Sequence, residues 1–213
     1  IILPKQNAKE AALIKEIKTI GVESLTEALA YIEGRKEILG EKFKENDMIS
    51  NSDSQVDIGW VKGQEYAKRA LEITAAGGHN LFMFGPPGGG KSLLAKALPS
   101  ILPQLNFAES LEVTKIYSAA GLLAEDQAII NLRPFRSPHH VISDVALIGG
   151  GSPLRLGEIT LAHRGVLFLD EFPEFDKKVL ETLRQPLEER EISISRARGS
   201  ITFPANFILI AAM

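Results

Sequence analysis

Cysteine is absent from the chain, and so are several features of secreted and membrane proteins. Without cysteine there can be no disulfide, thiolate metal site or cysteine nucleophile, which excludes these kinds of redox and metal chemistry. No apolar run approaches the roughly 18 residues that cross a bilayer, and the N-terminus lacks the order of a signal peptide. We therefore expect a cytoplasmic protein without membrane contact.

An excess of charge of one sign is also lacking. The 24 Lys and Arg residues against 27 Asp and Glu leave a net charge of −3, which gives no overall attraction to nucleic acid or to anionic membranes. A nucleic-acid contact would therefore need a local basic patch. A hydrophobic share of 45% over 213 residues fits an ordinary globular chain with one full domain and a smaller piece.

A polar stretch divides the chain. Residues 3–39 have apolar positions at helical spacing and predict two short helices separated by Gly21. Residues 40–57 are polar and contain a Ser, Asn and Asp cluster, which predicts a linker. Residues 58–213 follow as the larger unit. Because the chain does not begin with methionine and ends directly after an apolar run, we expect a fragment of a longer protein.

Three short apolar runs have the composition of buried strands. They lie at residues 80–84, 166–169 and 208–210, and helices are predicted at 64–76 and 92–98. Continuous apolar runs are typical of central parallel strands that are covered by helices on both faces. The sequence therefore predicts an α/β fold with a doubly wound parallel sheet.

The most specific motif follows the first of these runs. Residues 85–92 read GPPGGGKS and satisfy the phosphate-loop pattern G-x-x-x-x-G-K-[ST] in full, between a predicted strand and a predicted helix. Glycines let successive backbone N–H groups turn inward around phosphate oxygens. Lys91 would place its ammonium against the β- and γ-phosphates of ATP, and Ser92 would offer a hydroxyl to Mg²⁺ at the positive end of the helix.

The alternative is a glycine-rich turn that happens to precede Lys-Ser, and it leaves the order of strand, loop and helix unexplained. We therefore predict ATP and Mg²⁺ as cofactors. The residues predicted to contact ATP in this loop are Gly85, Pro86, Pro87, Gly88, Gly89, Gly90, Lys91, Ser92 and Leu93.

Two acidic residues follow the second apolar run, as Asp170 and Glu171. Ligands of open α/β sheets bind at the carboxyl ends of the strands. Asp170 would hold Mg²⁺ together with Ser92, and Glu171 would accept a proton from the water that attacks the γ-phosphate, with Lys91 as the second catalytic residue. A strand end that meets solvent with two acids is the alternative, and the phosphate loop makes it the weaker interpretation.

With GPPGGGKS, VLFLDE and the intervening FRSPHHVISDVALIGGGSPLRLGEITLAHRG, the sequence resembles the magnesium-chelatase-like AAA+ ATPases, and among them a branch implicated in DNA branch migration. The resemblance covers residues 58–213, and residues 1–39 resemble the tail of that branch's Lon-protease-like N-terminal domain. It implies a P-loop ATPase that assembles with copies of itself into a hexameric ring and acts on DNA. By resemblance, Val61 and Gly63 would lie near the adenine, and residues 192–204 would form a hairpin facing the pore.

The resemblance has departures. Leu154 and Leu156 stand where the family usually has prolines, and Arg164 stands where an asparagine is common. The family's sensor asparagine would follow Met213, and its arginine finger, second sensor arginine and helical lid lie further on. The resemblance therefore implies that this chain alone binds nucleotide weakly and hydrolyses it poorly.

Histidines and arginines outside these motifs have simpler interpretations beside the functional ones. The four histidines match no metal-ligand spacing, so polar contacts are favoured over a metal site for His79, His139, His140 and His163. Six arginines would either line a pore that grips a nucleic-acid backbone or be solvated or paired with Glu188, Glu189 and Glu191. These arginines are Arg133, Arg136, Arg155, Arg164, Arg196 and Arg198.

Three functions remain in competition. The leading one is an ATP-driven AAA+ motor whose expected substrate is DNA. The second is a chelatase-type subunit that uses ATP to remodel a partner protein, and the third is a nucleotide-binding switch without turnover. The resemblance of residues 1–39 to a Lon-like tail favours the first.

Overall fold

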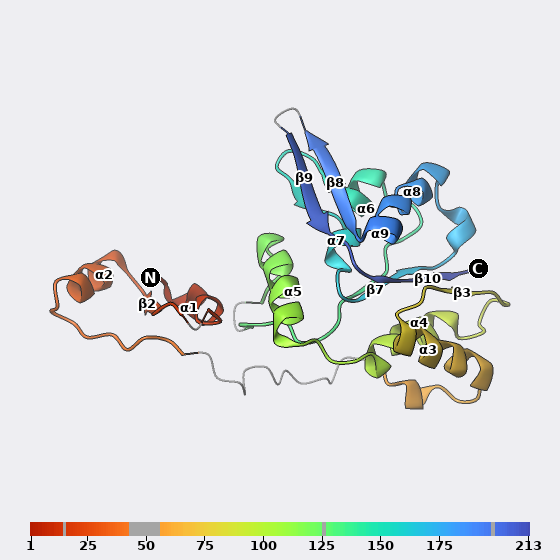
Figure 1. Cartoon of the computed structure of the whole chain (residues 1–213), viewed down its shortest axis with the longest axis horizontal. Helices are drawn as coiled ribbons and strands as arrows, with labels where there is room; N and C mark the ends of the chain where they lie inside the picture. Colours follow the sequence, from red (N-terminus) through yellow and green to blue (C-terminus); the bar gives the residue numbers. More distant parts are fainter. Residues whose placement is uncertain (15, 43–55, 125–126, 197–198) are drawn as a thin grey trace.

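The computed structural model describes residues 1–14, 16–42, 56–124, 127–196 and 199–213, with Ser195 and Arg196 described by their backbone alone. Most of the predicted linker at 40–57 and one of the six arginines, Arg198, therefore lie outside the described residues. Within those ranges no helix is long and apolar enough to cross a membrane. A small N-terminal body lies beside a larger α/β core (Figure 1).

Four parallel strands form the central sheet of the core, in the order β3, β10, β7, β4. Their bounds are β3 Leu81–Met83, β10 Ile208–Ala212, β7 Val166–Leu169 and β4 Phe135–Arg136. The central position of β10, the last strand in the chain, brings β3 and β7 to its two sides. The predicted parallel α/β fold is confirmed, and β4 escaped prediction because two residues are too few to show a pattern.

Helices cover both faces of this sheet, and β7 is therefore buried on both sides. Val166 and Phe168 pack into an apolar cluster with the helices α3 and α4, while Leu167 and Leu169 pack into a second cluster on the opposite face. Burial of each such side chain contributes about 1.5–3 kcal/mol. Figure 1 shows α3 and α4 below the sheet and α6, α8 and α9 above it.

The helices differ in length between the two faces. One face has the long helices α3 Glu65–Gly77 and α4 Lys91–Ile101, preceded by the 3₁₀ turn η2 Ile58–Trp60. The other face has short pieces: α6 Asp144–Ile148, α7 Glu158–Leu161, the 3₁₀ turn η3 Phe172–Glu174, α8 Lys177–Glu181 and α9 Arg184–Glu189. A small antiparallel pair, β5 Gly149–Gly150 and β6 Arg155–Leu156, follows α6 and places Leu156 opposite Gly149.

A separate helix, α5 Phe107–Ala119, borders the core. It begins with a capping box in which the side chains of Asn106 and Glu109 each accept a hydrogen bond from the other's backbone N–H. The Tyr117 hydroxyl donates to the Leu161 carbonyl at 3.1 Å, which joins α5 to α7.

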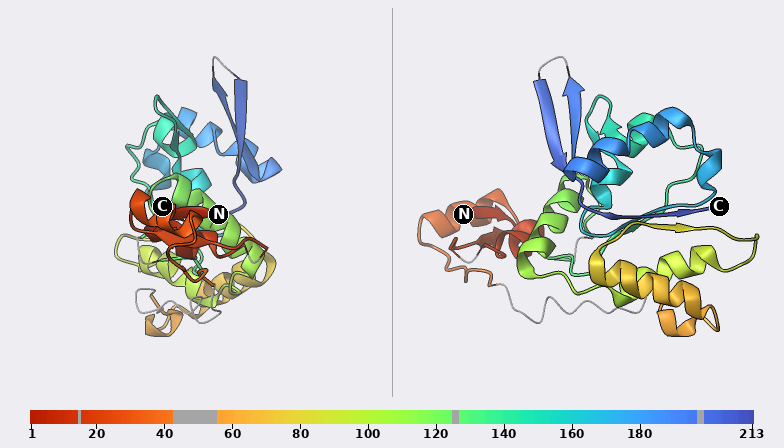
Figure 2. Two further views of the ribbon diagram at one scale, coloured as in Figure 1. Left: turned by 90° about the vertical axis from the view of Figure 1, so that its left-hand side faces the viewer. Right: turned by 45° about the vertical axis from the view of Figure 1, so that its right-hand side comes forward.

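An antiparallel hairpin, β8 Glu191–Arg196 and β9 Gly199–Pro204, stands away from the core in every ribbon view (Figures 1 and 2). Its base is anchored, because Ile192 is buried in the cluster on the upper face of the sheet and the Ala205 N–H donates to the Arg190 carbonyl at 2.8 Å. The hairpin coincides with the one expected over residues 192–204.

The N-terminal body differs from the prediction of two helices separated by Gly21. Its elements are β1 Ile2–Pro4, α1 Lys5–Ala11, β2 Ile20–Val22 and α2 Leu25–Ile32. The two helices exist, but Gly21 lies inside β2, which pairs in parallel with β1. Glycine is needed there because a Cβ would lie 2.8 Å from the Ala8 Cβ on α1. The helical spacing of apolar residues did not indicate this short strand pair, whose paired residues are 18 positions apart.

Candidate functional site

The glycine-rich loop lies between the carboxyl end of β3 and the first turn of α4, as predicted. Its start is tied to the neighbouring strand, because the Gly85 N–H donates to the Met213 carbonyl at 3.1 Å and the Met213 N–H donates to the Met83 carbonyl at 3.0 Å. Gly88 and Gly90 have φ values of 76° and 81°, a region that side chains with a Cβ rarely adopt. The loop conformation therefore depends on these two glycines.

Lys91 is the first residue of α4, and its side chain folds back over the loop. The ammonium donates to the carbonyl of Gly85 at 2.7 Å and to that of Pro86 at 2.9 Å. Two of the three N–H groups of the ammonium therefore stabilise the curved conformation of the loop. The charge lies at the mouth of the cavity that the loop encloses, close to the positive end of α4.

Ser92 and Asp170 are in direct contact, although 78 positions separate them in the sequence. The Ser92 hydroxyl donates to the Asp170 Oδ2 at 2.6 Å. Asp170 follows the last residue of β7, and its Oδ1 accepts the backbone N–H of Glu171 at 3.0 Å. The arrangement places one hydroxyl oxygen and one carboxylate oxygen side by side, a pair of the hard ligands that Mg²⁺ takes.

Glu171 has a strained backbone and a partner that sequence reasoning missed. Its φ of 53° lies in the left-handed region, and its side chain is 64% exposed. The Oε2 atom lies 2.9 Å from the Nδ1 of His140, whose ring also meets the edge of Phe175 and the ring of His139. Non-glycine residues in this backbone region are concentrated at functional sites. The position of β4 beside β7 would have suggested the contact between His140 and Glu171. The two residues of β4, however, show no sequence pattern from which a strand could be predicted.

A cavity of about 490 Å³ joins the loop to the acidic pair. Most of the predicted ATP contacts line it together with both acids and the chain end: Gly85, Pro87, Gly88, Gly89, Gly90, Lys91, Ser92, Leu93, Asp170, Glu171 and Met213. Cavities of this size hold small-molecule ligands. Pro86 is not among the lining residues and contributes its carbonyl to Lys91 instead.

Val61 and Gly63, the predicted adenine neighbours, do not line this cavity. Val61 is buried against α3 and α4, and Gly63 has a φ of 66° in the turn before α3. The turn nevertheless touches the loop, because the Gln64 side-chain amide donates to the Gly89 carbonyl at 3.3 Å. Their contact with an adenine stays a prediction.

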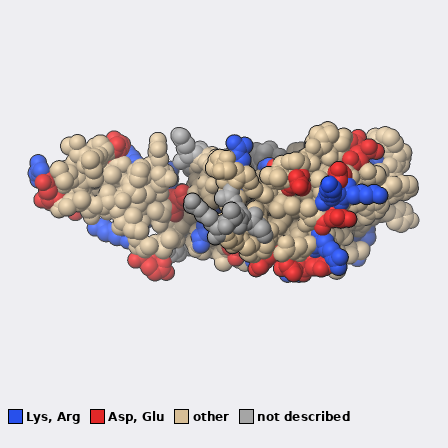
Figure 3. All heavy atoms as spheres, turned by 90° about the horizontal axis from the view of Figure 1, so that it is seen from above, with Lys and Arg blue, Asp and Glu red and all other residues tan. Residues whose placement is uncertain are grey.

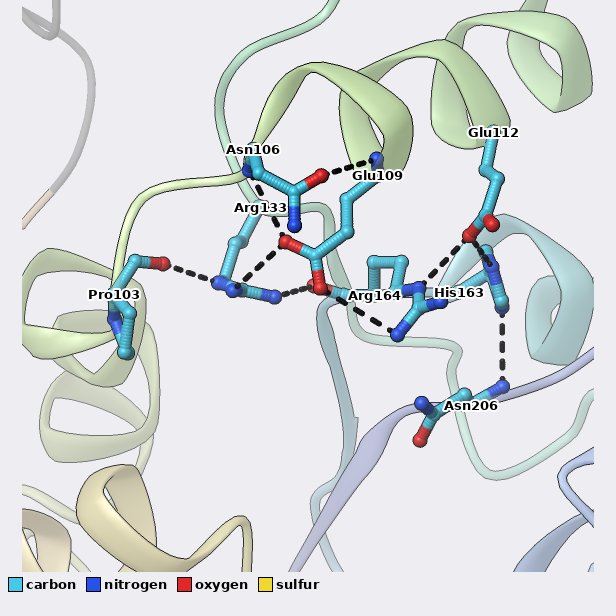
Figure 4. A network of polar contacts seen from close by, with 8 residues as sticks. All are labelled: Pro103, Asn106, Glu109, Glu112, Arg133, His163, Arg164 and Asn206. Atoms are coloured by element: carbon cyan, nitrogen blue, oxygen red, sulfur yellow. Dashed lines mark hydrogen bonds and ion pairs between the residues drawn. The ribbon is translucent and has the colours of Figure 1, made fainter.

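Three of the predicted basic residues form ion pairs within the chain, but not with the expected glutamates. Arg136 binds Glu158 through two hydrogen bonds of 2.5 and 2.7 Å, while Arg133 and Arg164 lie against Glu109 and Glu112 on α5 (Figure 4). The pairs of Arg133 and Arg164 were not predicted, because α5 is distant from both arginines in the sequence. The side chains of Arg196 and Arg198 are outside the described residues, and in the described part Glu188 pairs with Arg184.

His163 belongs to the same polar network, through its contact with Glu112 on α5. Its side chain is 4% exposed, its Nδ1 accepts the Asn206 N–H at 3.1 Å, and its Nε2 lies 3.1 Å from the Glu112 carboxylate (Figure 4). Burial lowers the pKa of the His163 imidazole, although the contact with Glu112 acts in the opposite direction. Within the described residues, no group of three or more His, Asp or Glu could hold a metal ion.

Comparisons with known proteins agree with this geometry. A family model described as magnesium chelatase, subunit ChlI, matches residues 57–213. Over the whole chain, identity is 45% to the competence protein ComM of Haemophilus influenzae and 47% to the protein YifB of Escherichia coli. The chain spans 42% and 41% of these two relatives.

Solved structures of AAA+ proteins have the same fold. The complex of magnesium chelatase subunits BchI and BchD matches with a TM-score of 0.57 and 25% identity, over 71% of this chain and 52% of that chain. NtrX of Brucella abortus in complex with ADP matches with a TM-score of 0.50 and 17% identity, over 79% and 31% of the two chains. The latter likeness concerns the fold alone.

The buried histidine predicts a loss of stability in mild acid. An unfolded histidine titrates near pH 6.5, whereas His163 in the folded chain takes up a proton only at lower pH. Its contribution to stability is therefore complete above about pH 6.5 and is lost as the pH falls toward the folded pKa. Urea unfolding at pH 7.5 and 5.5 should show a smaller pH effect in His163→Gln than in the original chain. The exposed His139→Gln is the matched control, and equal pH effects in all three proteins would contradict the prediction.

Proposed function

We propose, since the chain belongs to the family of the magnesium chelatase subunit ChlI and has the AAA+ fold, that it is the ATP-binding and ATP-hydrolysing core of an AAA+ motor. The observation that supports this most directly is the contact of Ser92 with Asp170 at 2.6 Å beside Lys91, in one cavity. The two side chains that would hold Mg²⁺ and the ammonium that would bind phosphate thus lie in one cavity, although they come from two distant segments.

In this proposal the loop holds the phosphates of ATP. The backbone N–H groups of Gly88 and Gly90 and the N-terminus of α4 would surround the anion, and Lys91 would supply a full positive charge to the β- and γ-phosphates. Ser92 and Asp170 would hold Mg²⁺, which keeps waters and phosphate oxygens as its remaining ligands. The bound ion would offset charge on the phosphates, and the oxygen-only chemistry of the pair suits it.

Glu171 is the proposed general base. It follows Asp170 at the mouth of the same cavity, where its carboxylate can reach a water near the γ-phosphate. His140 holds that carboxylate at 2.9 Å, which fixes its orientation. A passive nucleotide switch would not need an exposed carboxylate at a strained backbone position beside the metal ligand.

Because the chain spans less than half the length of these relatives, assembly and substrate are proposed for the whole protein. We propose that residues 1–39 end an N-terminal Lon-like domain, that 40–57 link it to the core, and that 58–213 form the core of a subunit in a hexameric ring. The hairpin at β8 and β9 would face the pore of this ring. Its projection from the core suits contact with a substrate (Figure 2).

DNA is the proposed substrate, and the one observation that favours it is that a relative with 45% identity is named a competence protein. The net charge of −3 gives no general attraction to DNA. Acidic and basic side chains are interspersed on the face drawn in Figure 3, so binding would depend on local groups rather than on a uniform field. Remodelling of a partner protein is the second candidate, favoured by the BchI–BchD complex among the similar structures.

Removal of the Lys91 ammonium should weaken ATP binding. A charge-assisted hydrogen bond contributes about 1.5–3 kcal/mol, so Lys91→Ala should lower the affinity for ATP and Mg²⁺ roughly ten- to hundredfold. Calorimetric or fluorescent-nucleotide titration of the chain measures this. Lys96→Ala is the matched control, since Lys96 is an exposed lysine on the same helix. Equal affinity of Lys91→Ala and Lys96→Ala would refute the assignment of the loop.

Substitution of the proposed base should separate binding from turnover. Glu171→Gln keeps the shape of the side chain but cannot accept the proton, so the full-length protein should retain ATP binding and lose roughly 10²–10⁴-fold in turnover. Steady-state ATPase assays and retention of bound ATP measure the two effects. Glu174→Gln, a nearby exposed acid, should leave turnover unchanged. Unaltered turnover in Glu171→Gln would indicate a different base or a passive binder.

The substrate class can be read from the salt dependence of DNA binding. If the full-length protein grips phosphates, the logarithm of its DNA affinity should fall with the logarithm of salt concentration, with a slope of about −0.9 per phosphate contact on duplex DNA. Titration of branched and linear DNA at several salt concentrations, with and without ATP, measures this slope. A slope near zero, or binding that branched DNA does not improve, would favour a protein substrate.

A further inference from the structure

We propose that a second cavity in the core, at the end of the sheet opposite the phosphate loop, is a binding site for a phosphate-class oxyanion. The cavity has a volume of about 280 Å³, and three arginines line it: Arg133, Arg164 and Arg190. Gly165 and Ile208, also in its wall, mark the amino ends of β7 and β10. It shares no lining residue with the cavity at Lys91. The length of β10 puts about 15 Å between the two.

Two of the arginines are fixed in place before any ligand arrives. Arg133 donates from Nε to the Pro103 carbonyl at 2.6 Å and from Nη1 to the Arg164 carbonyl at 2.7 Å (Figure 4). Arg164 donates from Nε to the Glu112 carboxylate at 2.9 Å. Immobilised side chains cost less conformational entropy on binding, so this arrangement favours recognition of a ligand.

Within the described residues, both fixed arginines keep donors that have no acceptor at hydrogen-bond distance. Glu109 is the carboxylate nearest to them, but its Oε2 already accepts the backbone N–H of Asn106 at 3.1 Å as part of the helix cap. Its contacts with Arg133 Nη2 and Arg164 Nη1 are 3.7 and 3.5 Å long. Contacts of this length are ion pairs without a well-formed hydrogen bond. Arg133 Nη2 and Arg164 Nη1 therefore remain available to an acceptor.

The third arginine provides an unbalanced charge. Arg190 follows α9 with a φ of 60°, is exposed, and among the described residues has no carboxylate or carbonyl bound to its guanidinium. Glu109 and Glu112 offset the other two arginines. The carbonyl end of α3, at Gly77 and Gly78 in the cavity wall, adds about half a negative charge. Arg190 is therefore the guanidinium of the cavity wall that no carboxylate of the described residues offsets.

The chemistry of the wall points to a tetrahedral oxyanion. A guanidinium presents paired N–H groups in a plane, which match two oxygens of a phosphate or a carboxylate. Three arginines line this cavity from three parts of the chain, the segment before β4, the turn before β7 and the end of α9. A carboxylate offers two oxygens in one plane, whereas a phosphate offers oxygens in several directions. The volume also far exceeds the roughly 30 Å³ share of one water.

The test uses inorganic phosphate as the probe and removes the first phosphate site. In the Lys91→Ala background, phosphate titrated into the chain and followed by ³¹P NMR line broadening should still bind. Adding Arg190→Asn, a residue that tolerates the left-handed backbone, should lower the phosphate affinity roughly tenfold. Arg184→Asn, on the helix that Arg190 follows, is the matched control, because Arg184 is exposed and does not line the cavity. It should leave the affinity unchanged.

Two results would overturn the proposal. One is the absence of phosphate binding in Lys91→Ala, and the other is an equal loss in Arg184→Asn and Arg190→Asn, which would indicate general charge attraction. Thermal unfolding of each variant verifies that the fold is intact, and Arg190 is exposed, so its replacement removes no core contact. If a short single-stranded oligonucleotide displaces phosphate, the natural ligand is a nucleic-acid phosphate. If it does not, the ligand is a free phosphate compound.

Discussion

The hydrogen bond between Ser92 and Asp170 is the constraint on which the candidate nucleotide site depends. It joins the first turn of α4 to the end of β7, and it can form only because β10 lies between β3 and β7 with all three strands parallel. Parallel strands bring their carboxyl ends to one edge, so a loop after β3 and an acid after β7 meet there. Sheet topology thus brings together two local motifs that are distant in the sequence.

The parts of this structure that the sequence predicted are those with strong local signals. Residues 166–169 form a continuous apolar run because both faces of β7 are buried, and a run of this kind has few other interpretations. The loop at residues 85–92 combines glycines with Lys91 and Ser92 at fixed spacing, so its place between a strand and a helix followed directly. The same reasoning predicted the parallel sheet.

The parts that the sequence did not predict depend on contacts between distant segments. His140 meets Glu171 because the two-residue strand β4 lies beside β7, and a strand that short leaves no periodicity to detect. Arg133 and Arg164 pair with glutamates on α5, which no spacing in the sequence relates to them. Gly21 was interpreted as a break between helices, whereas a close approach to Ala8 explains it.

The strand β10 connects the projecting hairpin to the nucleotide cavity, and only residues 205–207 separate it from β9. Asn206, held by His163 at the hairpin's base, and Met213, bonded to Gly85, lie at opposite ends of the segment that contains β10. A strand hydrogen-bonded on both sides cannot shorten or coil, so it behaves as a stiff rod. It therefore holds the base of the hairpin and the glycine-rich loop at a fixed separation, because β10 is paired with both β3 and β7.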